Sequence, residues 1–126
     1  MKESEILLAE GYATAATLHM ASGKQVAVAF DAENLVAVAS VLREKYPELR
    51  ITVCADNDKP NQHSENIGVE KANAAAAAIG GKVVVPLLSD EEKEAGLTDF
   101  NDLHRTRGLQ AVAAQLAEEA EIEVDL

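Results

Sequence analysis

The chain has 126 residues, a formal net charge of −11 at pH 7, one cysteine and 3% aromatic residues. This length fits one domain, and a single cysteine excludes an internal disulfide. Because phosphate backbones repel so acidic a chain and few rings are available to stack on bases, any action on nucleic acid requires metal ions or another domain to mediate the contact. No stretch resembles a signal peptide or a membrane span, so we expect a cytoplasmic protein without membrane contact.

Strands and helices are predicted to alternate along the chain. The predicted strands are residues 5–9, 25–30, 50–55 and 82–87. The predicted helices are residues 13–21, about 34–46, 67–79, a short helix opened by the capping pattern of Ser89–Glu92, and 109–120, with a polar element at 98–104 before the last. We expect one domain over residues 1–120 and an acidic C-terminal tail over residues 121–126, where a longer chain has been cut.

This alternation predicts an α/β fold in three layers, with helices on both faces of a compact, mostly parallel four-stranded sheet. Right-handed crossovers restrict the topology further. With the strand order 2-1-3-4, the first and third strands are neighbours about 4.8 Å apart. The order reverses between these two strands, and open α/β sheets bind ligands at the carboxyl ends of the strands at such a point.

Carboxylates follow two of these strands directly. Glu10 comes after the first strand, and Asp56 and Asp58 come after the third. Gathered at one edge, the three would repel each other unless a cation joined them, and hard oxygen ligands suit Mg²⁺. The pattern predicts a divalent-metal site that handles phosphates. The alternative is turn chemistry at Asp56–Asp58 and a solvated carboxylate at Glu10.

Three further residues are weaker candidates. Asp99 is either a fourth acid at the same edge or a helix N-cap with Asp102 at the third helical position. Lys59 and Lys71 are the basic residues closest to the acids in sequence and are candidates for binding a substrate phosphate. Lys71 also fits an ordinary solvated position on a helix.

Several motifs together resemble the Toprim domain, which is shared by bacterial-type primases, topoisomerases and some nucleases. Glu10–Ala15 resembles the first motif in its primase form, and Ala55–Asp58 resembles the second. Gly68–Ala72 is similar to the glycine-lysine stretch that follows in primases, and Thr98–Leu103 is similar to an element of plasmid and phage primases. Within the family, the resemblance is greatest to primases of the conjugative plasmid type.

The resemblance implies a DNA primase-type nucleotidyltransferase that makes RNA primers on single-stranded DNA for replication of a mobile element. It implies Glu10, Asp56 and Asp58 as catalytic, metal-binding acids for Mg²⁺ or Mn²⁺, with Asp99 as a looser match. Glu10 is either a ligand or a general acid/base. Single-stranded DNA and NTPs would be bound through the full-length protein, with flanking primase or helicase domains. The isolated domain is expected to make little or no primer.

Other functions stay open on the sequence alone. A metal-dependent nuclease of the Toprim family would use the same acids. A receiver-like phospho-acceptor module has a similar length and alternation, but it requires an acidic pair after the first strand and a lysine on a fifth strand. A Toprim domain that serves only in assembly is the remaining alternative.

Overall fold

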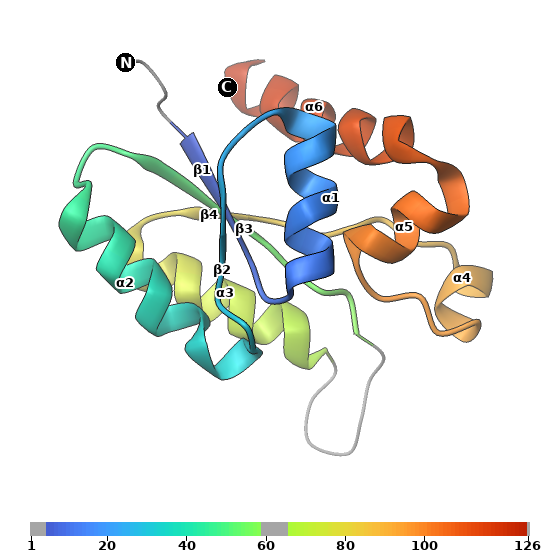
Figure 1. Cartoon of the computed structure of the whole chain (residues 1–126), viewed down its shortest axis with the longest axis horizontal. Helices are drawn as coiled ribbons and strands as arrows, with labels where there is room; N and C mark the ends of the chain where they lie inside the picture. Colours follow the sequence, from blue (N-terminus) through green and yellow to red (C-terminus); the bar gives the residue numbers. More distant parts are fainter. Residues whose placement is uncertain (1–4, 59–65, 126) are drawn as a thin grey trace.

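The computed structural model describes residues 5–58 and 66–125, and for residues 118–125 it describes the backbone alone. Strands and helices alternate through most of the chain (Figure 1). The strands are β1 (Glu5–Ala9), β2 (Val26–Val28), β3 (Arg50–Cys54) and β4 (Lys82–Val84). The helices are α1 (Tyr12–Ser22), the 3₁₀ turn η1 (Ala32–Asn34), α2 (Leu35–Lys45), α3 (Ile67–Ile79), α4 (Asp90–Glu94), α5 (Phe100–Arg107) and α6 (Leu109–Asp125).

The four strands form one parallel sheet in the order β2-β1-β3-β4. This confirms the predicted parallel sheet and the order in which the first and third strands are neighbours. β1 and β3 pair in register along their whole length, with Glu5 opposite Arg50 and Ala9 opposite Cys54. The carboxyl ends of the two central strands therefore stop at the same level.

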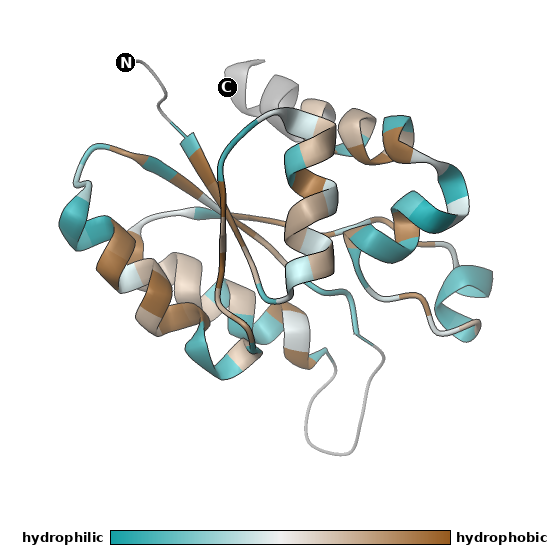
Figure 2. Cartoon of the chain, in the orientation of Figure 1, coloured by the Kyte–Doolittle hydropathy of each residue, from teal (hydrophilic) through white to brown (hydrophobic). Residues whose placement is uncertain are grey.

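Helices cover both faces of the sheet, as predicted. α2 and α3 pack side by side on one face, and α1, α5 and α6 pack together on the other (Figure 1). The strands that separate the layers are strongly hydrophobic (Figure 2). On the first face the core includes Leu8, Ile51 and Val53, against which the small side chains of α3 pack closely; on the second it includes Leu7, Leu18 and Phe100.

Both edge strands are shorter than predicted. β2 ends at Val28 because Phe30 takes a left-handed backbone conformation (φ 77°), which breaks the strand. β4 ends at Val84, two residues before Pro86, which has no N–H to donate to a neighbouring strand.

Two helical boundaries also differ from the prediction. The polar element at residues 98–104 is the helix α5, which begins at Phe100 after the N-cap Asp99. The last helix does not stop near residue 120: the backbone of residues 121–125, predicted as a separate acidic tail, continues α6. Among residues 5–58 and 66–125, no helix combines the length and apolar character needed to cross a membrane.

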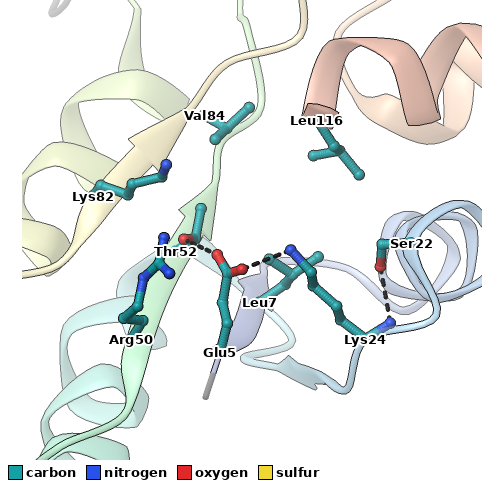
Figure 3. A pocket seen from close by; sticks show the side chains of 9 residues that line it. All are labelled: Glu5, Leu7, Ser22, Lys24, Arg50, Thr52, Lys82, Val84 and Leu116. Carbon is teal, nitrogen blue, oxygen red and sulfur yellow. Dashed lines mark hydrogen bonds and ion pairs between the residues drawn. The ribbon is translucent and has the colours of Figure 1, made fainter. Parts of the chain in front are cut away.

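Glu5 connects three segments at the amino end of the sheet (Figure 3). Glu10 follows the other end of the same strand. The Glu5 carboxylate accepts hydrogen bonds from Lys24 Nζ (2.6 Å) and from Thr52 Oγ1 (2.6 Å). The cavity beside it measures about 20 Å³, which is room for about one water molecule. Burial raises the pKa of Glu5, but the hydrogen bonds from Lys24 and Thr52 outweigh burial and leave the pKa below its ordinary value of 4.5.

Candidate functional site

Two acids meet where the central strands end. Glu10 follows the last residue of β1, and Asp56 lies two residues beyond the end of β3. Because Ala9 pairs with Cys54 in the sheet, the next residues of both strands leave it side by side. The Glu10 carboxyl group is close enough to Asp56 to be among the main causes that raise the Asp56 pKa. The sequence pattern predicted this convergence, since both acids follow neighbouring parallel strands.

The pKa of Asp56 shows that the acids act on one another. Partial burial, the adjacent Glu10 carboxyl group, and the charges of Asp99 and Asp58 together raise the Asp56 pKa from 3.8 to about 8. A raised pKa means that the ionised carboxylate is less favourable than usual at this position. A bound cation would stabilise the ionised form. The four predicted acids therefore form a single electrostatic cluster at the carboxyl edge of the sheet.

This acidic cluster (Glu10, Asp56, Asp58 and Asp99) fits a hard cation by its donor chemistry. All its side-chain donors are carboxylate oxygens, which suit Mg²⁺ or Mn²⁺ better than softer metals. Within the part of the chain that the structure describes, however, no three acidic, histidine or cysteine side chains are arranged around a common metal position. Metal binding would require carboxylate side chains to rotate toward each other.

Asp99 has both of the roles that the sequence left open. Its Oδ1 accepts the N–H of Asp102 (2.8 Å), and Asp102 Oδ2 accepts the N–H of Thr98 (2.9 Å), so the two aspartates cap α5 reciprocally. Asp99 also accepts a hydrogen bond from buried Thr14 on α1, and burial is the largest of the causes that raise its pKa. Thr14, which the sequence analysis did not single out, thereby ties α5 to the helix that follows Glu10.

Asn57, between the two aspartates, fixes the path of their loop. Its backbone N–H donates to the Thr98 carbonyl (2.6 Å), and its Nδ2 donates to the Pro86 carbonyl (2.8 Å). Its Oδ1 accepts from Asn66 Nδ2 (2.9 Å) and from Lys93 Nζ (2.8 Å). This side chain therefore holds the loop against three distant segments.

Asn66 and Gly68 connect the acidic loop to the start of α3. Asn66 Oδ1 accepts the N–H of Asp58 (2.9 Å) and the N–H of Val69 (3.2 Å), so one side chain caps the helix and holds the loop. A Cβ atom at Gly68 would lie 2.5 Å from the Asp56 carbonyl oxygen and 2.7 Å from Asp58 Oδ2. Only glycine allows α3 to approach the loop this closely.

A family model described as "Toprim domain" matches residues 5–110. The chain belongs to the Toprim family. The acidic cluster lies at the carboxyl edge of the Toprim sheet, between its two central strands. The fold predicted from the resemblance, a three-layer α/β Toprim fold with a parallel sheet, is thereby confirmed.

Curated relatives of this Toprim domain include two DNA primases TraC from Escherichia coli. One is 42% identical and the other 39% identical, each over 89 residues. The matched region is 69% of this chain but 6% and 8% of the two relatives, so the chain spans a small part of their length. No solved structure matches the chain significantly. The predicted similarity to plasmid primases is confirmed at the level of sequence.

Of the two lysines predicted to bind phosphate in this Toprim domain, the structure describes only Lys71. Lys59 lies outside the described residues. Lys71 pairs with Glu33 (Nζ to Oε2, 3.1 Å), which favours the alternative of an ordinary helix-surface residue. Lys93 on α4 instead donates to Asn57 Oδ1 and to the Asp58 carbonyl (3.3 Å). No local pattern marks Lys93, because its contacts span 35 and 36 residues of sequence.

Proposed function

We propose that this Toprim domain is the catalytic part of a DNA primase. It would carry out metal-dependent nucleotidyl transfer, making RNA primers on single-stranded DNA for replication of a mobile element. The observation that carries the proposal is the acidic cluster, in which Asp56 has a pKa of about 8 beside Glu10, Asp58 and Asp99. The similarity to plasmid primases supports the choice of primase among the activities of the family.

In this proposal Glu10, Asp56 and Asp58 hold Mg²⁺ or Mn²⁺, and Asp99 completes the set. The bound ion would neutralise these carboxylates and the phosphate oxygens of an incoming nucleotide. Glu10 is either a ligand or a general acid/base, as its position beside Asp56 is compatible with each role. Asn57, Asn66 and Lys93 hold the loop that carries the two aspartates.

The template would be held by other parts of the full-length protein, which would also contribute to the binding of NTPs. A net charge of −11 opposes binding of a DNA backbone, and the chain spans under a tenth of its primase relatives. We therefore propose flanking primase or helicase domains that supply basic surface, and a cytoplasmic location for the assembled enzyme.

Calorimetric titration of Mn²⁺ tests the metal site directly. We expect binding to the wild type and its loss in the double variant Asp56→Asn/Asp58→Asn. The matched control is Asp90→Asn/Glu91→Gln on exposed positions of α4, which replaces two acids that lie outside the acidic cluster. Equal loss in both double variants would show that Mn²⁺ responds only to net charge, and would contradict the proposed site.

Product analysis tests the reaction. We expect little or no primer from this chain alone on a bare single-stranded template with NTPs. Efficient priming would contradict the need for flanking domains. Metal-dependent cleavage of a phosphodiester without NTPs would instead favour the nuclease activity found in the same family.

A further inference from the structure

Two residues with exposed aromatic rings lie next to Glu10 along the backbone, in a chain that has four aromatic residues. Phe30 is 74% exposed and Tyr12 is 72% exposed. Tyr12 is the second residue after Glu10 and begins α1, while the N–H of Phe30 donates to the carbonyl of Glu10 (2.7 Å). Both rings therefore start from backbone that is adjacent to an acid of the cluster.

Phe30 is held in a backbone conformation that phenylalanine rarely adopts. Among the described residues it is the one non-glycine residue with a positive φ (77°). Hydrogen bonds fix both of its neighbours: Ala29 donates to the Ala9 carbonyl (2.9 Å) and accepts from Asn34 Nδ2 (3.1 Å), and Asp31 Oδ1 accepts the N–H of Asn34 (3.0 Å). Strain that the surroundings enforce in this way is typical of functional positions.

The fold gains little from the ring of Phe30. Its side chain is mostly in water, and a glycine would satisfy the same backbone hydrogen bonds without strain. A single exposed apolar residue is ordinary by itself. The distinguishing features are the combination of strain, exposure and a second exposed ring, all beside the acidic cluster.

We infer that Phe30 and Tyr12 form a stacking site for a nucleobase. This inference rests on the proposed function, because a cation at the acidic cluster would hold the phosphates of the same nucleotide. Aromatic rings bind bases through their faces and tolerate any base sequence. Tyr12 also lines an apolar groove of about 570 Å³ between α1 and β2, which Phe30 and the acidic cluster do not line. The inference therefore depends on the exposure of the two rings and on their backbone position next to Glu10.

Affinities for ATP and for inorganic tripolyphosphate, both in excess Mg²⁺, isolate the contribution of the base. In the variant Phe30→Gly we expect ATP to bind about fivefold or more weakly and tripolyphosphate to bind unchanged. We also expect its Tm to equal or exceed that of the wild type, since glycine accepts the positive φ. A residue with a purely structural role would lower the Tm and weaken both ligands together.

Two further variants control for the ring itself. Phe30→Trp keeps an aromatic face and should retain ATP affinity; its fluorescence should be quenched by ATP and not by tripolyphosphate, in a chain that otherwise lacks tryptophan. Tyr46 is 47% exposed and lies between α2 and β3, at the opposite end of the sheet from Glu10. The variant Tyr46→Leu removes this aromatic ring and should change the affinity for neither ATP nor tripolyphosphate.

The base can belong to a nucleotide or to single-stranded DNA, and a second pair of ligands separates these sources. A short oligonucleotide and its abasic counterpart are compared in the same variants. If Phe30→Gly weakens binding of the oligonucleotide relative to its abasic counterpart but leaves ATP unaffected, the site binds the template. If it weakens ATP relative to tripolyphosphate but leaves the oligonucleotide unaffected, the site binds the nucleotide.

Different results would contradict the stacking site and the proposed metal-dependent function. If tripolyphosphate binds the wild type but ATP and the oligonucleotide gain nothing from their bases, the stacking site is wrong while the metal site stands. If neither Mg²⁺ nor tripolyphosphate binds, the proposed function fails, and the stacking site fails with it.

Discussion

Asp56 is the residue at which metal binding and folding stability oppose each other. Its carboxyl group is partly buried beside Glu10, and its pKa of about 8 means that the charged form is disfavoured in the folded chain. In the unfolded chain the same group ionises near pH 3.8. At neutral pH the folded chain must therefore either protonate Asp56 or hold its charge beside the other acids, which destabilises the metal-free fold, and the same negative potential attracts a cation.

The variant Asp56→Asn should be more stable than the wild type when metal is absent. Asparagine keeps the shape of the side chain and removes the charge, so we expect the free energy of unfolding to rise by about 1–2 kcal/mol at pH 7.5, after allowance for solvent screening. Chemical denaturation in a chelator measures this difference. Added Mn²⁺ should stabilise the wild type and leave the variant unchanged. A variant less stable than the wild type in chelator would show that the Asp56 carboxylate is a structural acceptor instead.

At the residue level the sequence revealed the acids but not their supports. Glu10, Asp56 and Asp58 were predictable because each follows a strand, and parallel strands bring their carboxyl ends together. Asn57 and Lys93 were not predictable, since the bonds of Asn57 to Pro86 and of Lys93 to the loop span 29 to 36 residues and depend on how the segments dock. Spacing along the chain indicates which residues share an edge, whereas hydrogen bonds between loops depend on the assembled fold.

The start of α3 determines where the acidic loop lies. Gly68 in the first turn of this helix contacts the backbone of Asp56 and the carboxylate of Asp58, and the N-cap Asn66 holds the N–H of Asp58. The helix was predictable from its capping residue and its alanine-rich buried face. Its close approach to the loop was not predicted, although Gly68 lies in the stretch that resembles a primase motif.

The variant Gly68→Ala should displace the acidic loop. In a helix, glycine to alanine ordinarily stabilises by about 0.5–1 kcal/mol, but here the new Cβ would lie 2.5 Å from the Asp56 carbonyl oxygen. We expect a net destabilisation of about 1–3 kcal/mol and weaker Mn²⁺ binding, measured by denaturation and calorimetry. Asn73→Ala on the exposed face of α3 is the control, and it should leave Mn²⁺ affinity unchanged. Unchanged affinity in Gly68→Ala would show that the loop adjusts freely.

The central elements were predicted more accurately than the edges. β1, β3 and α3 matched closely because buried apolar runs and glycine or asparagine caps mark their limits. β2 and β4 were predicted too long, since an apolar sequence continues past the point where Phe30 and Pro86 end the strands. Ala29 and Pro86 are buried beyond the last paired residues, whereas Phe30 and Leu87 are exposed, so apolar character at these ends marks neither pairing nor burial reliably.

Across the whole molecule, charge is distributed unevenly between the two ends of the sheet. Carboxylates gather at the carboxyl end, whereas Lys24, Arg50 and Lys82 line the cavity around Glu5 at the amino end (Figure 3). The two ends respond to pH in opposite directions, because the pKa of Glu5 is lowered and the pKa values of Asp56 and Asp99 are raised. The net charge of −11 adds general repulsion above neutrality.

The free energy of unfolding, measured in chelator, should therefore be greatest on the acid side of neutrality, at about pH 5. Because the pKa of Asp56 is raised, its effect on stability is most favourable below 3.8 and is lost progressively as the pH rises toward about 8. Because the pKa of Glu5 is lowered, the stability it provides is present above 4.5 and is lost as the pH falls through its folded pKa. Stability should consequently decline on both sides of the maximum, as measured by urea denaturation between pH 3 and pH 9.

Two variants test which end of the sheet causes the loss of stability on each side of the pH maximum. Asp56→Asn should flatten the decline above pH 5, and high salt should flatten it further by screening the remaining repulsion. Glu5→Gln should lower stability at pH 6 and reduce the decline below pH 5, because the hydrogen bonds of Lys24 and Thr52 would no longer depend on an ionised partner. A wild-type maximum at or above pH 8 would contradict this account, since it would mean that ionised Asp56 does not oppose folding. Saturating Mn²⁺ should move the maximum toward higher pH, because the cation binds the ionised acidic cluster that otherwise destabilises the fold.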